Sequence, residues 1–144
     1  MTLHIIKLCV GAESIEDLAQ WQAGRIREQK KRGVRTPELV HVTRMTPKRR
    51  DEILDGGSLY WVIKGQIAVR QKLIDIRAVT KNGTPHCGLV YDPKLVPVQR
   101  RAHRAFQGWR YFDPRDAPAD ARGTKGLKQL PEKLQRELVD LGLL

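Results

Sequence analysis

Three consecutive cations stand where the sequence predicts the start of a short helix, at Thr46-Pro47. The unpaired N–H groups of a helix N-terminus carry a partial positive charge, so cations there are unfavourable. A bound phosphate reverses this effect, because free N–H groups and basic side chains hold the anion together. We therefore predict a phosphate contact at this helix start. Its residues, which include one cation from the preceding strand, are Arg44, Lys48, Arg49 and Arg50.

A second basic segment mixes cations with aromatic rings between residues 93 and 112, a stretch with five cations and no acidic residue. Phosphates require cations and unpaired bases require flat apolar surfaces, and this segment provides both. It predicts a nucleic-acid contact in which Trp109 or Tyr111 stacks on a base. The predicted phosphate contacts are Arg100, Arg101, Arg104 and Arg110.

Each basic cluster has a second interpretation. Asp51, Glu52 or Asp55 could neutralise the first cluster, which would then be an ordinary charged surface. The aromatic side chains of the second cluster could all belong to the core, with its arginines decorating a loop.

The sequence contains no phosphate-binding Gly-Lys-Ser/Thr loop, no nucleophile elbow and no His-Glu-x-x-His pattern. We interpret His41, His86 and His103 as structural residues. An enzyme acting on a nucleotide or a nucleic acid, with His41, Asp51 or Glu52 near a phosphate, is the alternative to a binding protein.

The chain has 144 residues and a net charge of +11, with 40% hydrophobic and 30% charged residues. This composition is typical of one globular domain, and the excess of cations favours a polyanionic partner over a surface that is basic for solubility alone. We expect a soluble cytoplasmic protein without a membrane partner, because the apolar runs are too short to span a bilayer and no basic leader is visible. Cys9 and Cys87 lack neighbouring metal ligands, so we expect free thiols, no metal and no cofactor.

Hydrophobic periodicity predicts the elements that must position these residues. The first half of the chain predicts a strand at 3–10, a helix from Ser14 to about Lys31 with an apolar stripe that includes Trp21, a strand at 39–45 and the short helix that ends at Gly56. The second half predicts strands at 58–64, 66–80, 86–91, 95–98 and 106–112. A phase shift in the second of these strands predicts a bulge between Arg70 and Leu73.

This order predicts an α+β fold with a curved, mainly antiparallel, barrel-like sheet, two helices in the N-terminal half and a C-terminal helix. We predict a single domain over residues 1–112, an exposed linker over 113–126 and a C-terminal helix within 127–144. The leucines at 134, 138 and 141 form a stripe that we expect to dock on the domain. Binding of a partner protein through this stripe is the alternative.

The run from Met45 to Gly65, together with Phe106–Tyr111 and Ile6–Gly11, resembles an uncharacterised family of short proteobacterial proteins known only as a domain of unknown function. The resemblance covers nearly the whole chain and implies no activity. More loosely, a helix ending in Ile-Leu-x-Gly before a strand pair is similar to the PUA-like superfamily. This superfamily includes the PUA, ASCH and EVE domains, so the similarity implies a small barrel that binds RNA or modified bases. The Gly-x-Lys pattern of ASCH domains is not matched after Leu54.

We therefore expect a nucleic-acid-binding protein, with RNA as its partner. The basic surface should bind the phosphates, and no residue is assigned a catalytic role. Neither the base preference nor the oligomeric state follows from the sequence.

Overall fold

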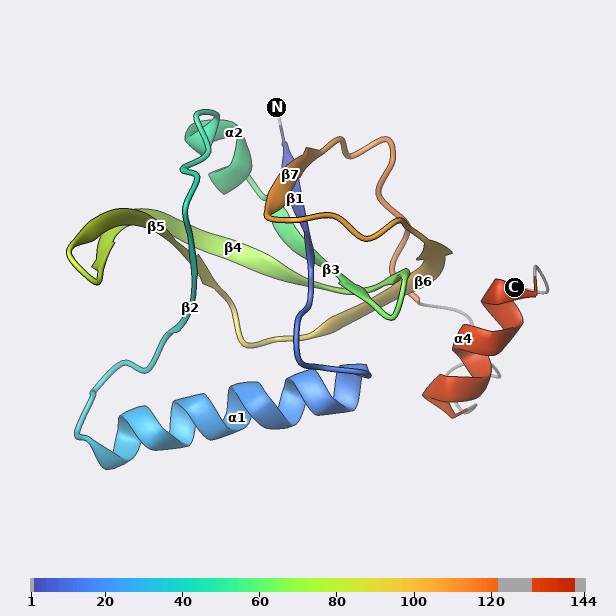
Figure 1. Cartoon of the computed structure of the whole chain (residues 1–144), viewed down its shortest axis with the longest axis horizontal. Helices are drawn as coiled ribbons and strands as arrows, with labels where there is room; N and C mark the ends of the chain where they lie inside the picture. Colours follow the sequence, from blue (N-terminus) through green and yellow to red (C-terminus); the bar gives the residue numbers. More distant parts are fainter. Residues whose placement is uncertain (1, 122–130, 142–144) are drawn as a thin grey trace.

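The computed structural model describes residues 2–121 and 131–141. Helices and strands follow the predicted α+β order, and Figure 1 shows their arrangement. The elements are β1 (His4–Leu8), α1 (Ile15–Lys31), β2 (Leu39–Thr43), α2 (Arg50–Leu54), β3 (Ser58–Ile63), β4 (Gln66–Lys81), β5 (Thr84–Tyr91), β6 (Val96–Ala102), β7 (Trp109–Phe112) and α4 (Glu132–Asp140).

Seven strands form one mostly antiparallel sheet in the order β2-β5-β4-β3-β1-β7, and β6 pairs with β4 off this path. The only parallel pair in the described sheet is β1 with β3, in which Lys7 lies opposite Trp61. β4 turns into β5 at Asn82-Gly83, where φ is 53° and 75°. These two positive φ angles are what a two-residue hairpin requires, so the predicted hairpin is confirmed.

Two irregularities bend β4, and neither lies between Arg70 and Leu73, where we predicted a bulge. The pairing with β3 shifts register at Ala68, and the pairing with β5 shifts at Ile74. Leu73 and Ile76 are consequently buried while Ile74 is 53% exposed. The phase shift was correctly predicted but its position was wrong, because both Leu73 and Ile74 are apolar and only the pairing decides which one faces the core.

The sheet is not closed into a barrel, which corrects the barrel-like part of the prediction. Its edge strands β2 and β7 are short and do not pair with each other within the described residues. Side chains bridge the opening instead: the Trp109 indole donates to the carbonyl oxygen of Met45 at 2.8 Å, and the Tyr111 hydroxyl accepts from the backbone N–H of Lys48 at 2.9 Å. Curvature thus brings the two edges together without a hydrogen-bonded ladder.

The sheet has a hydrophobic cluster on each face. Strand alternation sends Ile5, Leu59 and Trp61 to the concave face, where α1 packs through Leu18. Ile6 and Tyr60 point to the opposite face, which the segment around Phe106 covers. α1 itself begins as predicted, because the Ser14 hydroxyl caps it by accepting from the Asp17 N–H at 3.0 Å.

α4 docks on the domain mainly through polar contacts, not through its leucines. The Gln66 amide donates to the Arg136 carbonyl at 2.9 Å and to Asp140 at 2.7 Å. Leu134 and Leu141 are exposed, which corrects the predicted docking of the leucine stripe. The apolar pattern predicted the wrong contact because α4 is held at Gln66 of β4 by hydrogen bonds.

The predicted linker is partly built into the domain. Asp120 bridges to Val98 and pairs with Arg70 at 2.8 Å, and Pro118 is buried. Residues 122–126 of the linker and residues 127–130 and 142–144 of the predicted C-terminal segment lie outside the described residues. No helix in the described part of the chain is long and apolar enough to cross a membrane.

Candidate functional site

The predicted start of the short helix is wrong, because α2 begins at Arg50 and not at Pro47. The backbone N–H groups of Lys48 and Arg49 donate to the Tyr111 hydroxyl, at 2.9 and 3.3 Å. These are the donors that we expected to bind a phosphate. A neutral side chain from β7 occupies the position of the anion.

Two of the predicted phosphate-binding arginines are already paired with carboxylates. Arg49 makes a two-pronged contact with Glu52, at 2.5 and 2.8 Å, and lies over the Tyr111 ring. Arg50 binds Asp75 at 2.8 Å and the Ile76 carbonyl at 3.0 Å. The interpretation of this cluster as a surface neutralised by Asp51, Glu52 or Asp55 therefore holds for Arg49, whereas Arg50 is paired with Asp75 of β4, which that interpretation did not include.

The second predicted cluster is divided among several environments. Arg100 is only 5% exposed and pairs with Glu132 of α4 at 3.0 Å, so it is turned away from solvent. Arg101 donates to the Asp116 carbonyl, and Arg110 lies 4.7 Å from the centre of the Phe106 ring. The remaining cations of both clusters are exposed and make no ion pair among the described residues. They are Arg44, Lys48 and Arg104.

Trp109 and Tyr111, the predicted base-stacking residues, contact each other at a ring distance of 5.0 Å. Their polar atoms hold the segment after β2, as described above. Both rings therefore have structural partners, although they are not core residues: Trp109 is half-buried and Tyr111 is exposed.

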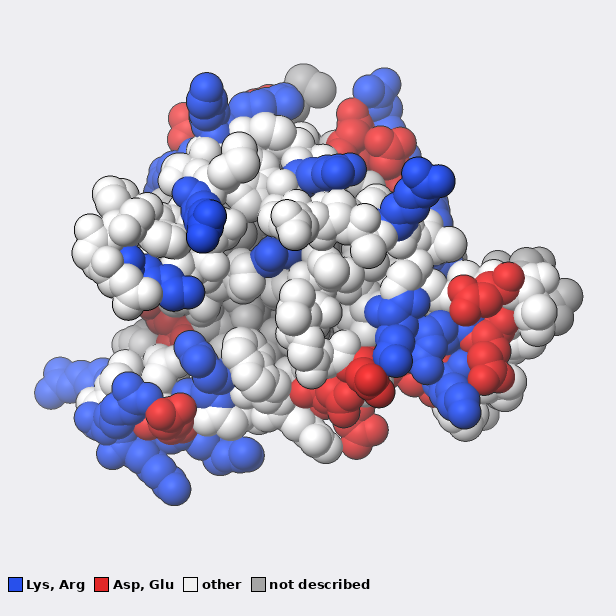
Figure 2. Space-filling model, viewed as in Figure 1, with Lys and Arg blue, Asp and Glu red and all other residues white. Residues whose placement is uncertain are grey.

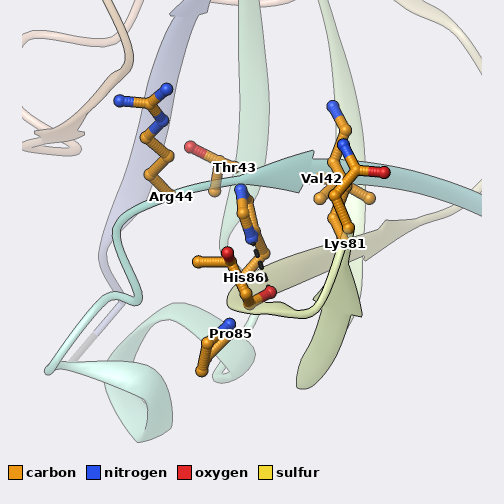
Figure 3. A pocket seen from close by; sticks show the side chains of 8 residues that line it. Val42, Thr43, Arg44, Lys81, Pro85 and His86 are labelled. Atoms are coloured by element: carbon orange, nitrogen blue, oxygen red, sulfur yellow. Dashed lines mark hydrogen bonds between the residues drawn. The ribbon is translucent and has the colours of Figure 1, made fainter.

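An open groove lies between the end of β2 and the hairpin that joins β4 to β5. We call it the hairpin groove, and its volume is about 690 Å³. Figure 3 shows Arg44 and Lys81 on opposite sides of it, with His86 between them. Its lining residues are Val42, Thr43, Arg44, Lys81, Asn82, Thr84, Pro85 and His86.

The charged side chains that line the hairpin groove are cationic. Within the described chain no carboxylate lines it, and neither Arg44 nor Lys81 has an ion-pair partner. His86 Nδ1 lies 2.9 Å from the Thr84 carbonyl, so this nitrogen carries the hydrogen and Nε2 faces outward as the second ring nitrogen. The groove can therefore contact phosphate through two cations and hydrogen-bond a ligand through one imidazole.

A second, smaller cavity of about 250 Å³ opens on the concave side of the sheet, and we call it the aromatic cavity. Four rings from four different elements line it. Its lining residues are those at 7–12, then Asp17, Leu18 and Trp21 of α1, His41 of β2, Trp61 of β3 and Tyr91 of β5. His41 meets the edge of Trp61 at a ring distance of 5.8 Å, and Trp61 meets Tyr91 at 5.9 Å.

Strand alternation explains why polar residues enter this cavity. Lys7 follows Leu3 and Ile5 on the inward face of the β1 segment, and His41 follows Leu39 on the inward face of β2. On each strand, the polar group lies two residues after the last buried apolar residue of the inward face, which is the next position on that face. Trp21 lies opposite on α1, is 53% exposed, and carries Arg25 over its ring at 5.3 Å. Of the apolar stripe predicted for this helix, Leu18 is buried whereas Trp21 is exposed.

Burial keeps the titratable groups of the aromatic cavity neutral, apart from Lys7 and Asp17. It raises the pKa of the Cys9 thiol to about 11, so this cysteine is not poised as a thiolate nucleophile. Burial and the charges of Lys7 and Lys81 lower the pKa of His41 to about 4. Burial also lowers the pKa of Lys7. The Asp17 carboxylate accepts from the Glu13 N–H at 3.1 Å.

Lowering the pH should destabilise the fold through His41. Its pKa is about 4 in the folded chain and 6.5 as the ordinary value, so the unfolded chain binds the proton first as the pH falls. We expect stability that is present above pH 6.5 to be lost towards pH 4. The shift corresponds to about 3 kcal/mol at full burial, and partial solvent access reduces this to about 2 kcal/mol.

Urea unfolding of the wild type and of His41→Gln, at about pH 7 and at about pH 4.5, measures the contribution of His41 to the free energy of unfolding. The variant should lose less stability than the wild type over this range. His4, whose pKa is also lowered by burial, contributes equally to both proteins and cancels. An equal loss in the two proteins would show that His41 is not held neutral by the fold.

Sequence reasoning missed most of this geometry. No functional role was predicted for Lys7, Trp21 or Lys81, and Lys81 lies just beyond the strand predicted at 66–80. A signal for Lys7 and His41 exists, since both interrupt an inward-facing apolar alternation. Nothing in the sequence marks Trp21 or Lys81 as facing a cavity.

The comparisons with known proteins add a family but no activity. No significant match was found among curated proteins or among solved structures. None of the comparisons connects the chain with the PUA-like superfamily. The resemblance to a family of unknown function is confirmed, because the model of the family described as "Protein of unknown function (DUF1489)" matches residues 5–144, nearly the whole chain, and the chain therefore belongs to this family.

Proposed function

We propose that this protein binds single-stranded nucleic acid, with RNA as the expected partner, and that the hairpin groove holds its phosphates. The observation that carries the proposal is a pair of cations without ion-pair partners in the described chain, Arg44 and Lys81, which lie on opposite sides of a groove that no described carboxylate lines. Both cations add positive potential at the groove, and no lining carboxylate of the described chain offsets it, which favours an anionic ligand there.

The surroundings of the hairpin groove support a polyanion over a single small anion. The net charge is +11, and Figure 2 shows lysine and arginine side chains around a central hollow of this face, while carboxylates gather farther out, near the start of α1, on α4 and at the upper right of the view. Lys48, exposed just beyond Arg44, extends the cationic surface along the chain. A strand of several phosphates can contact all three residues, whereas one phosphate cannot.

Reversing the charge of the groove should weaken RNA binding at least about 10-fold. The variant is Arg44→Glu with Lys81→Glu, and the measurement is fluorescence anisotropy of a labelled single-stranded RNA at about 50 mM salt. Loss of two phosphate contacts should also make the slope of log affinity against log salt shallower by about 1.4, since each contact contributes about 0.7 for single strands.

Lys94→Glu with Lys133→Glu is the matched control, because it changes the net charge equally at two exposed lysines outside the groove. It should weaken binding far less than the groove variant. Equal weakening by the two double variants would reject the groove as the site and leave only non-specific attraction. Absence of wild-type binding at about 50 mM salt would reject the proposed function itself.

A further inference from the structure

Four rings line the aromatic cavity, and one of them is exposed at its opening, where packing of a hydrophobic core does not account for it. Trp21 forms one wall from α1, His41 forms another from β2, and Trp61 and Tyr91 lie at the floor. Trp61 and Tyr91 are 4% and 2% exposed, whereas Trp21 is 53% exposed. A large apolar side chain exposed beside a cavity can cover a ligand that enters the cavity.

Size and charge narrow the class of ligand. A volume of about 250 Å³ is below the range of about 300–1,000 Å³ typical of sites for drug-sized molecules, so the cavity admits one small ring system. Lys7 brings a cation and has no ion-pair partner in the described chain. Asp17 is the one lining carboxylate in that part, and it already accepts a backbone hydrogen bond. A cationic ligand is therefore disfavoured, and a ligand that carries hydrogen-bond acceptors is favoured.

A purely apolar ligand is also disfavoured. It would cover the Lys7 ammonium and the His41 imidazole and deprive them of water without offering a hydrogen bond. A planar ring with carbonyl oxygens or ring nitrogens satisfies both requirements, because its faces stack on the rings while its edge meets Lys7 and His41. Heteroaromatic rings combine these properties.

We propose that the aromatic cavity binds one planar heteroaromatic ring with acceptor groups, and that an unpaired nucleobase is the natural occupant. The choice of a nucleobase rests on the proposed function. β2 connects the two sites, since His41 lines the aromatic cavity while Thr43 and Arg44 line the hairpin groove. Lys81 lies close enough to influence His41 while it lines the groove. A strand held in the groove can thus place one base in the cavity.

Figure 2 shows the hollow that this proposal fills. It lies between the β2 and β1 segments and above α1, with cations around its rim. The elements on its border are those that line the aromatic cavity. Phosphates at the rim and a base in the interior would match this distribution of charge and ring surface.

Free nucleosides test the cavity without involving the groove. The four common ribonucleosides are titrated to tens of millimolar, with ribose as the probe that lacks a base, and the tryptophan indole N–H signals are followed by NMR. At least one nucleoside should shift the signals of Trp21 and Trp61 saturably, while Trp109, which lies outside the cavity and is hydrogen-bonded to Met45, should not move. Ribose should shift none of them.

Two variants then localise the binding. Trp21→Leu removes the exposed wall and should weaken nucleoside binding at least about 5-fold, since stacking on an aromatic side chain contributes about 1–3 kcal/mol per base. Lys7→Met keeps the stem of the side chain and removes its charge, and should weaken binding about 5-fold. Lys72→Met, the same substitution at an exposed lysine outside both sites, should leave binding unchanged.

The outcomes separate this inference from the proposed function. The cavity proposal is overturned if no nucleoside shifts the Trp21 and Trp61 signals, if ribose shifts them equally, or if Trp21→Leu and Lys7→Met bind as tightly as Lys72→Met. RNA binding that depends on Arg44 and Lys81 would stand in each of these cases. Conversely, saturable nucleoside binding in a protein that does not bind RNA would support the cavity and reject the nucleic-acid partner.

Discussion

Replacing Gly57 by alanine is expected to destabilise the fold by more than about 3 kcal/mol. A Cβ atom at this position would lie 2.2 Å from the carbonyl oxygen of Leu3 and 2.3 Å from that of Ile53. Both contacts are with backbone, which cannot move aside as a flexible side chain can. The Gly57 N–H also donates to the Ile53 carbonyl at 2.8 Å, and the Gly57 carbonyl accepts from Leu73 at 3.0 Å. The start of β1, the end of α2 and the β3–β4 pair therefore meet at a point without room for a methyl group.

Urea unfolding followed by far-UV circular dichroism measures this effect, with Gly24→Ala as the matched control. Gly24 lies inside α1, and its nearest neighbour to an added Cβ atom is an Arg27 nitrogen at 3.8 Å. There alanine should stabilise the protein by about 0.5–1 kcal/mol, because glycine is a poor helix former. If Gly57→Ala stays within about 1 kcal/mol of the wild type, the backbones do not approach as closely as the structure shows.

Elements with local signals could be predicted from the sequence. Ser14 caps α1 through a residue three positions away, and Asn82-Gly83 supplies the positive φ angles of the hairpin within two residues. The start of α2 could not be predicted in the same way. Tyr111, more than sixty residues away in the chain, takes the backbone donors of Lys48 and Arg49 and so replaces the local helix signal of Pro47.

The open sheet could not be predicted for the same reason, because it depends on contacts between residues that are distant in the sequence. Strand propensity does not reveal whether the two edges of a curved sheet will pair, since this depends on how far the bulges at Ala68 and Ile74 bend β4. Edge closure by Trp109 and Tyr111 is a tertiary contact between side chains. In sequence, a segment rich in aromatic rings and cations resembles a nucleic-acid site. In the fold, the rings of Trp109 and Tyr111 bind the segment after β2.

The positive charge of the candidate site could be predicted from the sequence, but its location in the fold could not. Arg44 was identified from the sequence, whereas its partner across the groove, Lys81, comes from a hairpin whose position depends on the whole sheet. The aromatic cavity requires β1 and β2 to face each other, although they are not neighbours in the strand order. Polar residues at inward positions mark each strand separately, but only the folded arrangement brings Lys7 and His41 to one cavity.

Gln71→Leu is expected to cost about 3 kcal/mol, the second large effect on stability. Gln71 is fully buried, and its amide oxygen accepts from the Trp61 indole at 2.9 Å and from the Gln22 amide at 2.8 Å. Its amide nitrogen donates to Gln22 at 2.8 Å and to the Asp92 carbonyl at 3.0 Å. Leucine is similar in size but offers no hydrogen bond. It would leave the Trp61 indole N–H without its acceptor and take from the buried Gln22 amide both of its hydrogen bonds to Gln71, and each buried group left unpaired costs about 1–3 kcal/mol.

A double-mutant cycle with Gln22→Leu separates the loss of the network from a loss of packing. Gln71→Leu leaves the Gln22 amide without its two bonds to Gln71, and Gln22→Leu then removes that amide, so the double variant should be less destabilised than the sum of the two single variants by at least about 1 kcal/mol. Additive losses would mean that the two amides act independently. Because the network also fixes the Trp61 ring at the floor of the aromatic cavity, Gln71→Leu should move the Trp61 indole N–H signal in the free protein. The floor of the proposed base site and the buried link between α1 and the sheet are thus one hydrogen-bonded unit, in which stability and ligand geometry depend on the same side chain.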